Sequence, residues 1–160
     1  LKKTKIKIIS DGGIKFSGDI AKALAAGADA IMMGSIFAGT DESPGKKYKV
    51  KGKIYKQYRG MGSIGAMSSG SANRYFQKNF KDKSKFVPEG VEGRVEYKGS
   101  ISNIIYQLQG GLRSSMGYIG AKKLSEISKK AKFVKITKAG FYESMVHSVE
   151  MTQKTINYKL

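Results

Sequence analysis

Two turns near the start of the chain combine glycines with side chains that form hydrogen bonds. They contain Asp11, Gly12, Gly13, Gly34 and Ser35. Exposed backbone N–H groups at such turns bind anions, phosphate above all. A carboxylate such as that of Asp11 accepts hydrogen bonds at neutral pH and suits the two hydroxyls of a ribose. These residue types therefore indicate a nucleotide phosphate site, while two ordinary turns remain the alternative.

Each turn follows a short apolar run, residues 5–10 (KIKIIS) and 29–33 (DAIMM). Both runs are typical of strands buried on both faces. Between them, Ser17 can cap a helix, Asp19 falls in its first turn, and Gly27 is a good stop signal. The pattern predicts a strand, helix, strand unit with parallel strands. In a (β/α)₈ barrel the chemistry lies at the carboxyl ends of the strands, where both turns would meet.

The character of the sequence changes after Thr40. We expect a solvated turn at residues 41–45 that includes Asp41 and Glu42, then an exposed lysine-rich hairpin up to Arg59, then a Gly/Ser-rich segment. The remaining predicted elements are a returning strand at 93–98, a helix from Ser100 to about Leu112 with Ile101, Ile104, Ile105 and Leu108 on one face, a helix at 122–131 and a strand at 132–136.

Two glycine motifs fall short of known nucleotide-binding patterns. GMGSIG, residues 60–65, matches G-x-G-x-x-G, but a dinucleotide fold needs a buried strand before it and a firm helix after it. Here a lysine-rich run precedes it and the weak helix former AMSSGSAN follows. GTDESPGKK has five residues between its glycines, one more than the phosphate loop of nucleotide triphosphatases.

Composition limits the chemistry further. The chain has 160 residues, no cysteine and one histidine, His147, which we expect to be a packed or surface residue. Thiolate chemistry and histidine-rich metal sites are therefore excluded within the chain. No apolar run reaches the length of a membrane span, and a cytoplasmic setting is expected. The net charge of +18 favours anionic ligands, but with only four arginines and the lysines spread along the chain, nucleic acid is not expected to be the main partner.

Several longer stretches resemble bacterial inosine monophosphate (IMP) dehydrogenase, in the same order as in that family. They are ISDGGIKFSGDIAKALAAGADAIMMGSIFAGTDESPG, YRGMGSIGAM, NRYFQ, PEGVEGRV, GGLRSSMGYIGA and ESMVH, within residues 5–158. The resemblance implies an α/β fold, the carboxyl-terminal portion of a (β/α)₈ TIM barrel. Residues 1–160 would supply strands seven and eight, the last helices and the tail, with 46–98 as a mobile flap insertion. Because the chain begins with Leu1, we expect it to start partway through a longer protein whose upstream part carries the catalytic cysteine.

The family oxidises IMP to xanthosine monophosphate with NAD through a covalent intermediate on that cysteine, which is then hydrolysed. By resemblance, Asp11 would bind the ribose and Glu89 the purine edge. The resemblance implies phosphate contacts from Gly13, Gly34, Ser35 and Tyr58, and contacts near the base from Gly60, Met61 and Gly62. Gly12 joins the substrate-binding residues because its N–H lies in the first turn.

The resemblance also implies the remaining roles. Arg74 and Tyr75 match a catalytic pair on the flap, where the arginine activates water for hydrolysis. Ser114, Gly117 and Tyr118 match positions that approach the NAD adenosine of a neighbouring subunit in a homotetramer. Glu143, Ser144 and Met145 match positions whose carbonyls hold a potassium ion. Family members often have histidine where this chain has Met145, a minor change if carbonyls are the ligands.

Three alternatives stand beside this interpretation, one of them, the reductase, drawn from family resemblance. A free guanidinium stays protonated near neutral pH, so chemistry alone favours an anion-binding role for Arg74. The related guanosine monophosphate reductase shares the phosphate loops but lacks a long flap with an Arg-Tyr pair, so NRYFQ favours the dehydrogenase. A basic, non-catalytic RNA-binding module would instead show salt-sensitive binding that is indifferent to IMP.

Overall fold

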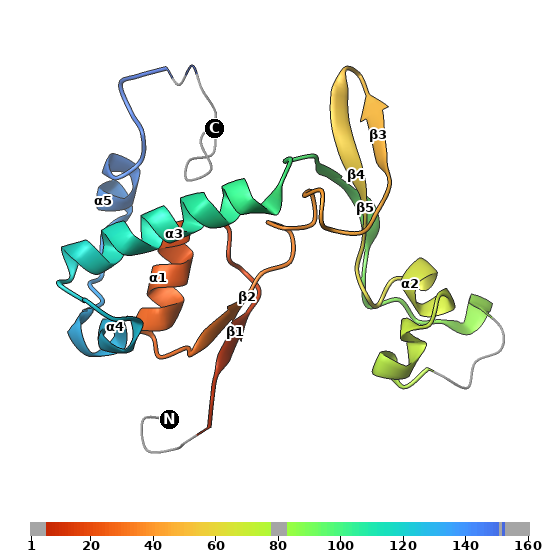
Figure 1. Ribbon diagram of the computed structural model, residues 1–160, viewed down its shortest axis with the longest axis horizontal. Coiled ribbons are helices and arrows are strands. Elements are labelled where there is room, and N and C mark those ends of the chain that lie inside the picture. The colour runs from red at the N-terminus through yellow and green to blue at the C-terminus, as the bar shows by residue number, and fades with distance from the viewer. Residues whose placement is uncertain (1–5, 78–82, 151, 153–160) are drawn as a thin grey trace. The chain divides into compact units, whose positions relative to one another are not determined.

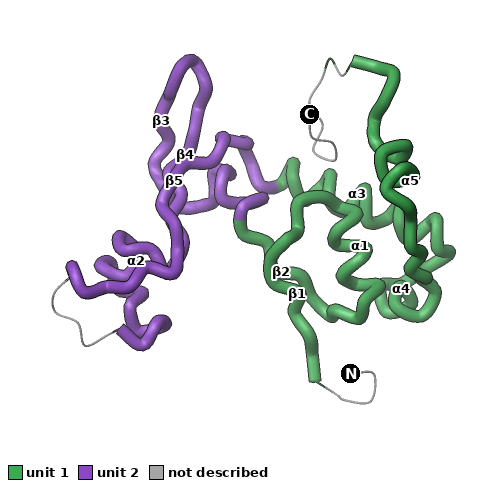
Figure 2. The backbone as a smooth tube through the Cα atoms, turned by 180° about the vertical axis from the view of Figure 1, so that it is seen from behind, with its two compact units in different colours: residues 1–34, 102–160 green, residues 35–101 purple. Residues whose placement is uncertain are grey.

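The computed structural model describes residues 6–77, 83–150 and 152 (Figure 1). The chain divides into two compact units, shown in separate colours in Figure 2. The first unit comprises residues 1–34 and 102–160, and the second comprises residues 35–101. The second unit includes the predicted flap, of which residues 78–82 lie outside the described residues.

The first unit begins with the predicted strand, helix, strand arrangement. Strand β1 (Ile9–Asp11) and strand β2 (Ala30–Met32) flank helix α1 (Ser17–Ala25). The strands are parallel, with Ile9 opposite Ala30 and Asp11 opposite Met32. The prediction of a parallel pair is confirmed, although β1 is shorter than the predicted run 5–10, whose Lys5 lies outside the described residues.

The prediction that both strands are buried on both faces is wrong for this chain. Ile9 is 57% exposed and Met32 is 50% exposed. Among the described residues, β1 and β2 form a sheet of two strands that pair only with each other. Two strands cannot cover both faces of one another, so their apolar side chains stay accessible.

Helix α1 is capped differently from the prediction. Its N-cap is Phe16, and Ser17 is the first helical residue. The Asp19 carboxylate accepts hydrogen bonds from the backbone N–H groups of Lys15 and Phe16, both at 3.1 Å. Asp19, at the third helical position, thus reaches back to the backbone at and just before the N-cap, as the acidic residue of a capping box does. Gly27, at φ +108°, follows the helix end as predicted.

Three further helices belong mainly to the first unit: α3 (Ile101–Tyr118), α4 (Leu124–Lys130) and α5 (Lys138–Glu143). Helix α3 runs six residues beyond the predicted end at Leu112 and stops before Gly120, whose φ is +66°. Ile104 and Leu108 of α3 are buried, as predicted, but Ile105 of the same predicted face is 39% exposed. Ile127 of α4 is only 2% exposed. Burying one such side chain stabilises a fold by about 1.5–3 kcal/mol.

The predicted strand at 132–136 is absent. Residues 131–137 have no regular structure, and Phe133, Val134 and Ile136 are 66%, 80% and 60% exposed. A short apolar run becomes a strand only where another strand accepts its backbone hydrogen bonds, and none does so among the described residues.

The second unit contains a sheet of three antiparallel strands in the order β3 (Lys47–Val50), β4 (Lys53–Arg59), β5 (Glu92–Glu96). Lys51 and Gly52 both have positive φ, +47° and +79°, which suits a two-residue hairpin turn. The predicted hairpin and returning strand are confirmed. Between β4 and β5 lie helix α2 (Ile64–Ser68) and the 3₁₀ turns η1 (Ser71–Tyr75) and η2 (Lys83–Lys85).

Asp41 and Glu42 are exposed in a bend, as predicted for a solvated turn, and both carboxylates also form hydrogen bonds. Asp41 pairs with Lys47 and accepts from the Tyr97 hydroxyl at 2.8 and 2.9 Å. Glu42 accepts from Ser100 Oγ at 2.9 Å and from the N–H of Ile101 at 2.8 Å. Both carboxylates thus tie the start of the second unit to its end.

Two further expectations concern His147 and membrane spans. His147 is exposed, and its ring contacts the Met145 carbonyl and the Glu143 carboxylate on the surface. Among the described residues, no helix has both the length and the apolar character that a membrane span requires.

Candidate functional site

The carboxyl ends of β1 and β2 lie next to each other, since Asp11 is opposite Met32 in the register. Gly12 and Gly13 follow at φ +84° and +76°, a conformation that side-chain-bearing residues rarely adopt. A Cβ added at Gly12, Gly13 or Gly34 would meet no atom within 4 Å, so the space beside these three residues is open. The edge of the sheet therefore exposes backbone from two turns beside the exposed Asp11.

Ser35 begins the second unit and is held from within it. Lys98 Nζ donates hydrogen bonds to the carbonyls of Ser35 at 3.3 Å and Ile36 at 3.0 Å. These bonds fix the backbone directly after Gly34 and bring a positive charge to that segment. An ammonium group there favours an anion nearby.

A second group of predicted site residues comes together around Gly62. Its carbonyl accepts from the N–H groups of Glu89 and Gly90, both at 3.0 Å, and Gly60 N–H donates to the Val91 carbonyl at 2.8 Å. A Cβ at Gly62 would lie 2.9 Å from Tyr75 Cζ and 3.2 Å from Glu89 Cβ. Only glycine allows this close approach, so the loop, Glu89 and the Tyr75 ring form one cluster.

Arg74 and Tyr75 lie in η1, next to this cluster. Ser71 Oγ donates to the Met61 carbonyl at 2.5 Å, which fixes the start of η1 on the glycine loop. Arg74 is exposed and Tyr75 is half-buried. Tyr58 lies in β4, half-buried and paired with Gly93.

Two residues that hold this cluster together were missed from the sequence. Glu92 Oε1 accepts from Gly65 N–H at 2.7 Å, at the start of α2. Gln77 is buried, and its side-chain amide bonds both backbone groups of Val87. Gln77 lies in the stretch NRYFQ and Glu92 in PEGVEGRV. Their hydrogen-bond partners are distant in sequence, so no local pattern predicts either contact.

Ser114 and Tyr118 line a polar hollow of about 380 Å³ in the first unit. Its other side is the start of α1, with Phe16, Gly18 and Asp19. Burial of Asp19 opposes its ionisation, but hydrogen bonds from Lys15, Lys22 and Phe16 outweigh this and lower its pKa. Gly117, between the two predicted contacts on α3, does not line the hollow. The 91% exposed ring of Tyr118 is free for stacking.

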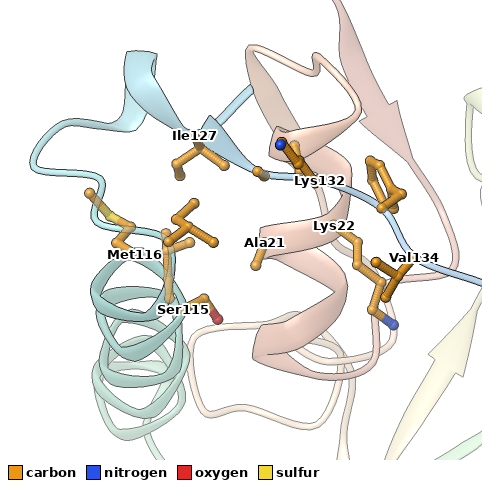
Figure 3. Close-up of a pocket in the computed structure, with 12 residues that line it drawn as sticks. Ala21, Lys22, Ser115, Met116, Ile127, Lys132 and Val134 are labelled. Carbon is orange, nitrogen blue, oxygen red and sulfur yellow. The ribbon is translucent and has the colours of Figure 1, made fainter. Parts of the chain in front are cut away.

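A separate pocket of about 290 Å³ lies between α1, α3 and α4 (Figure 3). Ala21, Met116 and Ile127 contribute apolar atoms, and the segment with Lys132 and Val134 closes one side. None of the predicted site residues lines it.

The predicted cation positions Glu143, Ser144 and Met145 lie at and just after the end of α5. Carbonyl oxygens at a helix end carry partial negative charge and suit a monovalent cation. The Met145 carbonyl is 2.9 Å from His147 Nδ1. Within the described part of the chain, no group of three or more His, Cys, Asp or Glu side chains is placed to hold a metal ion.

The structure thus brings together two sets of predicted residues. Asp11, Gly12, Gly13 and Gly34 share one sheet edge in the first unit. Gly60, Met61, Gly62, Tyr75 and Glu89 share one cluster in the second unit. The first set offers backbone N–H groups and a carboxylate, and the second offers a glycine loop held against Glu89 and the Tyr75 ring.

Comparison with known proteins identifies the family of this chain. The family model described as "IMP dehydrogenase / GMP reductase domain" matches residues 1–147. The inosine-5'-monophosphate dehydrogenase of Chlorobaculum parvum is 58% identical over 158 residues, covering 98% of this chain and 32% of the relative. The dehydrogenase of Aquifex aeolicus is 58% identical, and the match covers 96% of this chain and 31% of the relative. That of Cryptosporidium parvum is 56% identical, and the match covers 96% of this chain and 38% of the relative. The chain spans about a third of the length of these relatives. It belongs to the IMP dehydrogenase / GMP reductase family.

Proposed function

We propose that this chain is the carboxyl-terminal part of the (β/α)₈ barrel of an IMP dehydrogenase. The intact enzyme oxidises IMP to xanthosine monophosphate with NAD, in guanine nucleotide biosynthesis. This chain supplies the phosphate site and the flap, residues 46–98, while the cysteine nucleophile lies upstream. The observation that carries the proposal is the parallel, in-register pairing of β1 and β2, which sets two glycine turns side by side.

The sheet edge is the site of the nucleotide phosphate. N–H groups of Gly12, Gly13, Gly34 and Ser35 donate to the phosphate oxygens, and the contact of the Tyr58 hydroxyl rests on family resemblance alone. Gly12 and Gly13 are in the left-handed conformation and have open space at the Cβ position, which leaves room for a ligand beside their backbone. Asp11 accepts hydrogen bonds from the ribose hydroxyls. Lys98, on the Ser35 carbonyl, adds a nearby positive charge.

The Gly62 cluster is the base site. The backbone of Gly60, Met61 and Gly62 faces the purine, and the Glu89 carboxylate accepts a hydrogen bond from a ring N–H. The Glu89 N–H donates to the Gly62 carbonyl, which holds the Glu89 backbone against the glycine loop. Arg74, with Tyr75 beside it, activates the water that hydrolyses the covalent intermediate.

The residues present fit the two expected cofactors. The exposed Tyr118 ring and the polar hollow beside Ser114 suit the adenosine of an NAD bound by a neighbouring subunit of a homotetramer. NAD supplies the hydride acceptor when bound. Carbonyls of Glu143, Ser144 and Met145 suit potassium, which prefers neutral oxygen ligands, and the remaining ligands come from upstream. The proposed location is the cytoplasm, where IMP, NAD and potassium are all present.

The sharpest test joins this chain to the upstream two-thirds of the Chlorobaculum parvum dehydrogenase, whose matching third is 58% identical. We expect this chimera to reduce NAD when IMP is added, faster with potassium than without. The 160-residue chain alone should bind IMP weakly and turn nothing over, because it has no cysteine.

Three outcomes contradict the proposal. A chimera that folds as a tetramer but does not respond to IMP excludes the phosphate and base sites. Activity of the chain alone excludes the division of labour with an upstream cysteine. Oxidation of NADPH with guanosine monophosphate, in place of IMP oxidation, identifies the reductase branch of the family instead.

A further inference from the structure

The side chain of Gln77 makes a paired contact with one distant backbone residue. Its Nε2 donates to the Val87 carbonyl at 3.1 Å, and its Oε1 accepts from the Val87 N–H at 2.9 Å. Gln77 is 8% exposed, and its own N–H donates to the Ala72 carbonyl at 3.0 Å. Only a side-chain amide offers a donor and an acceptor in this spacing. The contact therefore depends on the side-chain amide.

This contact joins the segment that contains Tyr75 to the segment that contains Glu89, both of which belong to the Gly62 cluster. Gln77 lies two residues after Tyr75, and Val87 lies two residues before Glu89. Glu89 is already fixed to the Gly62 carbonyl, and the start of η1 is fixed by Ser71 on the Met61 carbonyl. Gln77 supplies the second anchor of η1, just after its end. Arg74 and Tyr75 lie between the two anchors.

We infer that Gln77 is a positioning residue for the hydrolytic step. It holds Arg74 and Tyr75 at a fixed place relative to the segment that meets the purine. This inference rests on the proposed function, because it assigns hydrolysis to Arg74. A misplacement of about 1 Å costs on the order of a hundredfold in rate when a reacting group must be aligned. Hydride transfer does not use the Arg74 pair and should be insensitive to Gln77.

The test compares the unmodified chimera with its Gln77→Ala variant, step by step. Rapid mixing with IMP and NAD measures hydride transfer as the first burst of reduced cofactor, and the steady state measures hydrolysis. We expect Gln77→Ala to keep the burst within about twofold and to slow the steady state about tenfold or more, with the covalent intermediate accumulating. Gln57→Ala, at an exposed position of β4 in the same unit, is the matched control and should leave both steps unchanged.

Two further measurements keep the result interpretable. Gln77→Glu retains the shape but places a carboxylate against the Val87 carbonyl, so it should show the same step-selective loss even if the alanine variant fails to fold. Amide hydrogen exchange should show the Val87 N–H losing protection in both variants, while the N–H of Gly60 stays protected.

The possible failures are distinguishable. An unmodified chimera without IMP-dependent activity contradicts the proposed function, and the catalytic part of this inference with it. An active chimera in which the variants leave both steps unchanged, or slow both equally, contradicts this inference alone. Unchanged protection of Val87 would show that the contact itself is not formed.

Discussion

Lys56 Nζ donates to the Thr40 carbonyl at 2.5 Å, deep inside the second unit. Lys56 is 2% exposed and Thr40 is fully buried. The same ammonium also donates to the Ser43 carbonyl. A buried lysine is costly unless its donors are paired, and here two backbone carbonyls pair with it. Lys56 therefore fixes the loop after the proposed phosphate site against β4, the strand that leads to Tyr58 and the glycine loop.

Replacing Lys56 by methionine should destabilise the second unit. Methionine fills most of the space but donates no hydrogen bond, so the carbonyls of Thr40 and Ser43 lose their donor. An unpaired buried polar group costs about 1–3 kcal/mol. Urea unfolding, followed by tyrosine fluorescence, should show a lower midpoint. Lys53→Met, at the exposed start of the same strand, is the control. Equal midpoints for the two variants would contradict the role assigned to Lys56.

Asp41 should make the free energy of unfolding decrease as the pH falls into the acid range. Its hydrogen bonds with Lys47 and then with Tyr97 lower its pKa below the ordinary value. The folded state thus binds the proton less tightly than the unfolded state does. The stabilising contribution is complete above the unfolded pKa of about 3.9 and is lost as the pH falls through the lower folded value. Unfolding midpoints measured from pH 6 to pH 2 should fall more for the unmodified chain than for Asp41→Asn. Parallel curves for the two proteins would count against the pairing.

Arg74 should matter for one chemical step only. In the chimera, Arg74→Ala should slow hydrolysis by about 10²–10⁴, the usual contribution of a positioned acid or base, and leave the burst of reduced cofactor intact. Arg94→Ala is a suitable control, because Arg94 lies over the Tyr55 ring in the same unit, in β5. If both steps fall together in Arg74→Ala, the arginine binds an anion and does not activate water.

The sequence predicted those parts of the fold that depend on neighbours along the chain. The parallel pair, α1, the hairpin and α4 follow from apolar spacing and turn residues. The bonds of Asp41 to Tyr97 and of Glu42 to Ile101 join residues 56 and 59 positions apart, and no local pattern encodes them. The run 132–136 has strand-like residues, but an edge partner decides whether it pairs, and sequence spacing cannot supply one.

The candidate site also has a part that local residue types predicted and a part that they could not predict. The two glycine turns were predicted from residue types alone, because phosphate binding needs little beyond exposed backbone N–H groups. The roles of Tyr75, Glu89 and Gly62 came from family resemblance. Their contact in space depends on Gln77 and Ser71, which bond backbone groups of Val87 and Met61.

Gly62→Ala should disrupt the base site. The added methyl group would lie 2.9 Å from Tyr75 Cζ and 3.2 Å from Glu89 Cβ, so the ring or the loop must move. Such overpacking costs about 1–3 kcal/mol, and the chimera should show a higher KM for IMP and a lower kcat. Gly93→Ala in β5 is the control, since nothing lies within 4 Å of its Cβ. Normal kinetics for Gly62→Ala would mean that the cluster is not the purine site.

Gly34→Ala separates ligand contact from protein stability. A Cβ at Gly34 meets nothing within 4 Å, and its backbone is not in the left-handed conformation, so the free chain should tolerate alanine with an unchanged unfolding midpoint. If a phosphate lies against this backbone, the same methyl group blocks its approach. The chimera should then bind IMP at least about tenfold more weakly, equivalent to about 1.4 kcal/mol, by calorimetry. Gly110→Ala, also with open space at its Cβ, controls for the substitution itself. Full IMP affinity in Gly34→Ala would show that the phosphate does not approach the end of β2, and the proposed site would have to be abandoned.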